Sequence, residues 1–121
     1  MDEKSILQSI KKMLGISKED THFDMDVIIH INSYFMVLNQ LGVGPPDGFT
    51  ITNGSSEWSQ FLGDPKKLEL TKTFIYLNVK LVFDPPSSTA VIESMKEQIK
   101  EYAWRLQVAA DPEEEEIQNG K

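Results

Sequence analysis

The chain has 121 residues, a mass of 13.8 kDa, 40% hydrophobic and 26% charged residues, and a formal net charge of −7 with a pI near 4.7. This length fits one domain, and the lack of cysteine excludes disulfide scaffolds, thiolate metal sites and cysteine nucleophiles. The single arginine and the acidic balance argue against a dedicated nucleic-acid binder, which needs several basic contacts to phosphate on one face.

The chain offers no apolar run of about 18 residues that could span a bilayer. Its charged N-terminus leads into an amphipathic segment and is unlike a signal peptide. We therefore expect no membrane association and a protein that is made in a cytosol.

The first predicted element is a helix over residues 4–14. Its apolar residues fall at relative offsets of 0, 1, 4, 7 and 8, which places them in one stripe along a helix. Lys4, Lys11 and Lys12 lie mostly outside this stripe, and Gly15 stands where a C-cap glycine ends a helix. The segment therefore predicts a short amphipathic helix.

The strongest helical pattern covers residues 24–41. Its apolar residues repeat at steps of 4, 3, 4 and 3, and two neighbouring positions widen the stripe into a broad face. Asp24 is the predicted N-cap, and Asp26 adds negative charge to the first turn, where the helix dipole favours it. Gly42 is expected to end the helix.

Residues 43–56 are rich in the turn pairs Pro-Pro, Asp-Gly and Asn-Gly. A loop of this length in a small domain is usually functional or disordered. Residues 56–62 then predict one short helix that ends at Gly63 and packs the loop onto the core through its aromatic side chains.

The third long helix is predicted over residues 65–83. Asp64 and Pro65 form a helix start signal, and apolar residues surround the helix almost completely from Phe74 to Phe83. We expect this helix to be the central and most buried one. Its β-branched residues leave a strand over 73–83 open, but eleven residues without alternation favour the helix.

The last helix is predicted over residues 88–107, after the Asp-Pro-Pro break at 84–86. The predicted fold class is therefore all-α: a small bundle of four main helices plus one short helix, with a long loop at 43–56. The predicted division is a helical domain over 1–107 and an acidic, disordered tail over 108–121, which contains four consecutive glutamates. The predicted core combines stripes from three long helices: Ile31, Leu38, Phe74, Leu77, Leu81, Ile99 and Tyr102.

The sequence carries no familiar catalytic or metal-binding pattern. His22 and His30 lie eight positions apart, which matches no known ligand spacing, and we interpret His30 as a residue that packs at the edge of a helix stripe. The carboxylates of Asp24 and Asp26 are explained by the helix dipole. We therefore expect no enzyme activity, no catalytic residues, no metal and no cofactor.

The aromatic residues are more numerous than one core stripe per helix requires. Two of them, Tyr76 and Trp104, point away from the predicted stripes. They either plug the sides of a small core or lie in a protein–protein interface, where Trp and Tyr are enriched. The candidate interface residues are Phe49, Trp58, Tyr76, Trp104 and Arg105.

Four segments carry a family resemblance. They are the opening Lys12-Met13-Leu14-Gly15-Ile16, the aspartates at the start of the second helix, the stretch YLNVKLVFDPP, and the closing segment from Glu101 to Leu106. In this order, over about residues 4–107, they resemble the small all-helical head–tail connector proteins (adaptor or head-completion proteins) of tailed phages and prophages. The long loop and the acidic tail depart from the shorter adaptors.

The resemblance implies a structural virion protein without cofactors. Such adaptors form a ring, usually of twelve copies, which docks on the portal protein and joins it to a stopper or tail-terminator protein in the phage neck. The ring extends the channel used in DNA packaging, and DNA passes through it without specific binding. The resemblance also implies that the protein is made in the bacterial host cytoplasm and becomes part of the virion connector.

Two other classes of function remain open from the sequence. A small helical regulator would use residues 89–106 as a DNA-recognition helix, but Glu93, Glu97 and Glu101 give its exposed side the wrong charge for a groove. A helical protein-interaction module of the host is the other alternative. The position of the gene, between portal and tail genes or elsewhere, distinguishes these classes from a connector.

Overall fold

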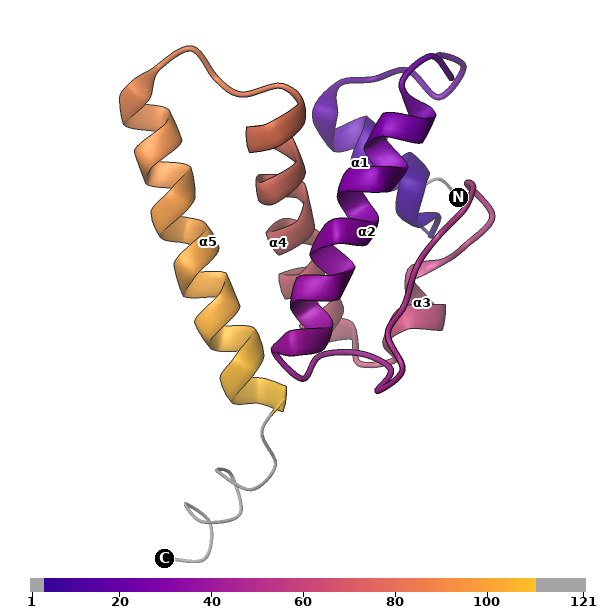
Figure 1. Ribbon diagram of the computed structural model, residues 1–121, viewed down its shortest axis with the longest axis vertical. Helices are drawn as coiled ribbons and strands as arrows, with labels where there is room; N and C mark the ends of the chain where they lie inside the picture. The colour runs from indigo at the N-terminus through magenta and orange to yellow at the C-terminus, as the bar shows by residue number, and fades with distance from the viewer. Residues whose placement is uncertain (1–3, 111–121) are drawn as a thin grey trace, which may run out of the picture.

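The computed structural model describes residues 4–110, and within this range the chain forms five helices and no sheet (Figure 1). The predicted all-α fold of four main helices and one short helix is confirmed, and residues 73–83 are helical. The ends differ from the prediction by a few residues, since the last helix includes residues 108–110. The other predicted tail residues, 111–121, lie outside the described range. The helices are α1 (Ile6–Leu14), α2 (Asp24–Gln40), α3 (Trp58–Phe61), α4 (Pro65–Phe83) and α5 (Thr89–Ala110).

Helix α4 occupies the centre of the bundle, as its nearly all-round apolar surface predicts. It packs against α1, α2 and α5, and Figure 1 shows α5 on one side of it and α1 on the other. Helix α5 makes its main helix–helix contact with α4. Since α5 has one principal neighbour, most of its surface faces outward.

The predicted end of α1 and the predicted start of α4 are confirmed by their local geometry. Gly15 has φ of +82° and ends α1, in the left-handed region that glycine adopts without strain. The Asp64 carboxylate accepts hydrogen bonds from the backbone N–H groups of Lys66 and Lys67, with Pro65 in the first turn of α4. These contacts satisfy backbone donors that a helix start would otherwise leave unpaired.

The N-cap predicted for α2 is wrong. Phe23 occupies that position, and Asp24 is already the first helical residue. The Asp24 carboxylate points instead to α1, where its Oδ1 lies 2.8 Å from Lys11 Nζ. The carboxylate at the start of α2 therefore forms an ion pair with a lysine of α1.

The placement predicted for Lys11, mostly outside the apolar stripe, is also wrong. Its side chain is only 1% exposed, and its Nζ donates to the carbonyl oxygens of Asp20 at 2.8 Å and Lys18 at 3.3 Å. Together with Asp24, these oxygens surround the ammonium group. The connection between α1 and α2 folds over the lysine. Helix periodicity does not predict this burial, because it depends on contacts with residues outside the helix.

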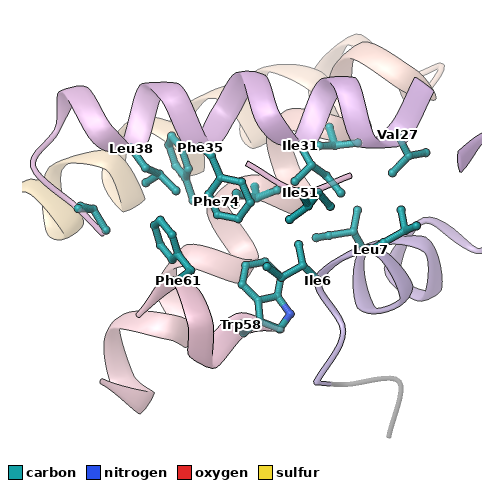
Figure 2. Packing of buried hydrophobic residues seen from close by; sticks show 14 of the residues in the cluster. Ile6, Leu7, Val27, Ile31, Phe35, Leu38, Ile51, Trp58, Phe61 and Phe74 are labelled. Atoms are coloured by element: carbon teal, nitrogen blue, oxygen red, sulfur yellow. The ribbon is translucent and has the colours of Figure 1, made fainter. Parts of the chain in front are cut away.

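The buried apolar cluster lies between α1, α2, α3 and α4 (Figure 2). Four residues of the predicted core are buried, namely Ile31, Leu38, Phe74 and Leu77. The other three, Leu81, Ile99 and Tyr102, are partly exposed, so the core lies further toward the N-terminal half than predicted. The physical reason is that loop residues and α3 fill the space on one side of α4. The cluster consists of Ile6, Leu7, Ile10, Val27, Ile31, Phe35, Leu38, Val43, Ile51, Trp58, Phe61, Phe74, Ile75, Val79 and Leu106.

Candidate functional site

Two asparagines of α2 fasten the long loop at 43–56. Asn39 Nδ2 donates to the carbonyl oxygens of Pro45 and Pro46, each at 3.2 Å. The Asn32 side-chain amide donates to the Ile51 carbonyl oxygen at 2.9 Å, and its Oδ1 accepts from the Ile51 N–H at 2.8 Å. Ile51 itself is 1% exposed and enters the core. The two hydrogen bonds between Asn32 and Ile51 satisfy the backbone N–H and C=O of Ile51, as pairing with a neighbouring strand would, and they fix the position of the loop along α2.

Two of the candidate interface residues, Phe49 and Trp58, make internal contacts. The Phe49 ring packs edge-on against Phe35 and Phe61, with ring centroids 5.1 Å and 5.4 Å apart. Trp58 is 2% exposed, and its Nε1 donates to Ser9 Oγ at 2.8 Å. Trp58 is thereby placed in the interior, whereas Phe49 is partly buried and lies at the edge of a surface groove.

The other three candidates lie on α4 and α5. Tyr76 is partly buried and packs against the core cluster, which fits the first of the two alternatives, a residue that closes the side of a small core. Trp104 is 64% exposed, although tryptophan is a large hydrophobic residue. Arg105 is exposed beside it and pairs with Glu101 on the preceding turn. The five residues thus do not form one site, and Trp104 is the one that presents a large aromatic surface outward.

The exposed side of α2 carries a second apolar surface, which the sequence reasoning missed. Met25, Ile29 and Met36 are 74%, 56% and 65% exposed. Their spacing of four and seven residues puts them within about 40° of one another around the helix. We call these three residues the α2 stripe. The available signal was that apolar residues are present on both sides of this helix.

A groove beside the α2 stripe runs between α2 and the long loop. Its volume is about 320 Å³, and Met36 belongs both to its wall and to the α2 stripe. Its lining combines the hydrophobic side chains of Met36 and Phe49 with polar ones, as protein interfaces combine apolar burial with hydrogen bonds. The lining residues are Asn32, Met36, Asn39, Asp47, Gly48, Phe49 and Thr50.

Several ionisable side chains in the described part of the chain form ion pairs, such as Lys11 with Asp24 and Arg105 with Glu101. Burial raises the pKa of Tyr34 above its ordinary value, which keeps the phenol protonated. His22 packs against Phe23, whose ring contacts Phe83 in turn. Between residues 4 and 110, no three His, Asp or Glu side chains are placed to hold a metal ion.

The net charge is concentrated outside the described helices. Residues 4–110 contain 11 Lys and Arg against 12 Asp and Glu, which leaves −1 of the total of −7. Residues 111–121 contain five acidic residues and one lysine, and so contribute −4. None of the helices in residues 4–110 is long and apolar enough to cross a lipid bilayer.

Large apolar side chains are exposed on α2 and on α5, and such exposed groups are typical of surfaces that bind other proteins. The sequence matches the family model of the phage connector protein over residues 6–113, and the chain belongs to this family. No significant match was found among curated proteins or among solved structures. The resemblance inferred from the sequence is therefore confirmed at the level of the family.

Membership defines a structural role in the phage head–tail connector and a location in the virion. It also implies contacts with other head or tail proteins of the phage. The exposed residues on α2 and α5 are the described groups best suited to such contacts, because burial of large apolar side chains provides most of the energy of an interface.

Proposed function

We propose that the protein is the adaptor of the phage neck: it forms a ring, of about twelve copies by analogy with such adaptors, that docks on the portal and joins it to a stopper or tail-terminator protein. The observation that carries this proposal is the family match together with two separate exposed apolar surfaces, the α2 stripe and Trp104. An adaptor needs separate surfaces for two kinds of contact: one for the neighbouring copies of its own ring, which meet head to tail, and another for the portal or the tail-side protein.

The groove and the α2 stripe suit the contact with a neighbouring ring. Met36 and Phe49 offer apolar surface, and Asn39 and Asp47 add polar groups around it. The Asn32–Ile51 hydrogen bonds preorganise this region, so docking requires little ordering of the loop. We assign this surface to the portal or to the tail-side partner, and α5 with Trp104 and Arg105 to contacts between copies.

The charge distribution suits a ring that lets DNA pass. The described residues have a net charge close to zero and contain a single arginine, so a channel built from them offers few attractive contacts to phosphates. A strongly basic lining would bind DNA and slow its movement.

Cryo-electron microscopy of the neck of particles that contain this protein tests the proposal. We expect a ring of this chain between the portal and the next tail-side protein. A non-ring assembly, or a position elsewhere in the particle, would overturn it. A gel-shift assay at low salt separates the DNA-binding alternative, since the adaptor is expected to produce no shift with duplex DNA.

A variant pair tests the assigned surface. Met36→Glu places a charge in the centre of the apolar surface, and we expect binding to purified portal to fall by at least about tenfold. Gln98→Glu adds the same charge at an exposed position of α5, away from the groove, and binding should change less than about twofold. Equal losses in both variants would contradict the assignment.

A further inference from the structure

A second groove runs between α1 and α4, on the side of α4 that faces away from α5. It consists of two adjoining parts, of about 370 Å³ and 190 Å³, which share Lys72 in their walls. We call it the α1–α4 groove. One part is lined by Lys4, Glu57, Trp58, Ser59, Leu68 and Lys72, and the other by Ser9, Lys12, Met13, Glu69, Lys72 and Thr73.

The cations of this groove are only partly neutralised. Lys4 and Lys12 are exposed and pair with no carboxylate among the described residues. Lys72 Nζ lies 3.3 Å from Glu69 and 5.8 Å from the centroid of the Trp58 ring, and both of these residues line the groove. The three lysines exceed the two glutamates, and Met13, at 42% exposed, adds apolar surface between them. The groove therefore suits an acidic peptide that also carries an apolar residue.

The chain contains one segment of this chemistry. Residues 111–121 hold Asp111 and the four glutamates 113–116, and Ile117 follows directly. The family match ends at residue 113, so most of this acidic sequence is a property of this chain and not of the family model. Eleven residues reach about 36–40 Å when extended, which is longer than the central helix they would have to pass.

The arrangement of the helices decides which copy supplies the segment. Residue 111 follows the end of α5, whereas the groove is bounded by α1, and α4 lies between these two helices (Figure 1). In a head-to-tail ring, the α5 side of one subunit faces the opposite side of the next subunit. We infer that the acidic segment 111–121 of each copy binds the α1–α4 groove of the neighbouring copy and ties the ring together. This inference rests on the proposed ring assembly.

Peptide binding tests the groove as the site. A fluorescent peptide of residues 109–121 is titrated into the full chain in which Glu113 to Glu116 are replaced by glutamine, so that its own segment does not compete. We expect the groove variant K4Q/K12Q/K72Q in this background to weaken binding by about tenfold or more. The matched variant K80Q/K96Q/K100Q removes the same charge from α4 and α5 outside the groove and should weaken binding less than about threefold. Equal weakening in both would overturn the proposal, because it would reduce the effect to general charge attraction.

A mixing experiment identifies the copy that donates the segment. A ¹⁵N-labelled chain with Glu113 to Glu116 changed to glutamine has an intact groove, and an unlabelled K4Q/K12Q/K72Q chain has an intact acidic segment. We expect amide shifts at α1 and the first turns of α4 in the labelled chain that grow with the concentration of the unlabelled one. Shifts that are seen only when both parts lie in the same chain would overturn binding between copies, and so would no shifts at all.

The same two variants separate this proposal from the adaptor function itself. If the chain with neutralised glutamates occupies the neck as a ring in virions, and its ring is as stable as the wild-type ring at low salt, where charge attraction is screened least, the groove proposal fails and the adaptor function stands. If the wild-type chain is found outside the neck, the adaptor function fails regardless of the result with the peptide.

Discussion

The two sides of α4 are built differently. On one side, α1, α2, α3 and the long loop meet in a cluster of fifteen buried residues, to which α5 contributes only Leu106. On the other side, α5 lies against α4 with much of its surface exposed, and Met95 and Leu106 are its buried hydrophobic residues within the described range. The first side is a closed hydrophobic core. On the second side, α5 lies at the edge of the bundle and much of its surface is exposed to solvent. The fold is thus specified by its N-terminal side, and the other side is left available for contacts.

The largest expected effect is the loss of an aromatic ring from the closed side. Phe35 is 1% exposed and contacts Phe49, Phe61 and Trp58. Phe35→Ala should lower the free energy of unfolding by about 4 kcal/mol, because it leaves a cavity among aromatic rings. Urea denaturation followed by circular dichroism measures this change. A loss below about 1.5 kcal/mol would mean that the cluster is not closely packed.

The buried ion pair should rank second. Lys11→Met keeps the length of the side chain but leaves the Asp24 carboxylate and two carbonyl groups without their cation, and we expect a loss of roughly 3 kcal/mol. Lys12→Met is the matched control, since Lys12 is exposed, and should change stability by less than about 0.5 kcal/mol. Similar values for the two variants would contradict the burial of Lys11.

Two glycines of the loop distinguish close packing from backbone conformation alone. Gly44 and Gly48 both have positive φ, at +89° and +92°. A Cβ on Gly44 would overlap the Phe61 ring, whereas one on Gly48 meets nothing within 4 Å. Gly48→Ala should cost about 1 kcal/mol for the backbone alone. Gly44→Ala should cost about 1–3 kcal/mol more, because the Phe61 ring must move. Thermal denaturation compares them, and equal costs would show that the loop moves away from the ring freely.

A truncation on the edge helix should cost less than one in the cluster. Ile99 is partly exposed and packs at the margin of the core. We expect Ile99→Ala to lower the free energy of unfolding by about 1–2 kcal/mol, near the lower limit for buried aliphatic residues. Urea denaturation provides the value, and a cost equal to that of Phe35→Ala would place α5 in the core and remove the distinction between the two sides.

The smallest effect on folding is expected at Trp104. Because its side chain is 64% exposed, Trp104→Ala should change stability by less than about 0.5 kcal/mol. The same variant should weaken the assembly of the ring, as a large exposed aromatic residue at an interface between copies would. Native mass spectrometry with portal measures the assembly. Normal assembly of a normally folded variant would exclude Trp104 from the interface between copies.

Local patterns predicted the helices because helix ends depend on residues that lie next to one another. Asp64 with Pro65, and Gly15, specify their helix ends by side-chain hydrogen bonds or by backbone freedom that a few residues determine. The contacts of Lys11 and Asp24 were not predicted because the partners of Lys11 lie seven to thirteen residues away, and only the folded connection between α1 and α2 brings them together. Periodicity contains no information on such closures.

The candidate interface was only partly predictable for a similar reason. An aromatic residue outside a helix stripe has two possible fates, and the sequence left both open for Tyr76 and Trp104. For Phe49, the path of the long loop determines the outcome, because it brings the Phe49 ring into contact with Phe35. The α2 stripe was missed because a helix that is apolar on two sides does not reveal which side the rest of the chain covers.

The environment of Lys11 has a consequence for the order in which the chain acquires structure. An ammonium group can leave water only when oxygen atoms replace its hydration shell, and those of Asp20, Asp24 and Lys18 all belong to the connection and to the start of α2. Helix α1 therefore cannot reach its native packing before these residues are in place. Residues 6–24 should open and close as one cooperative unit, with amide protons that exchange with solvent at a common rate.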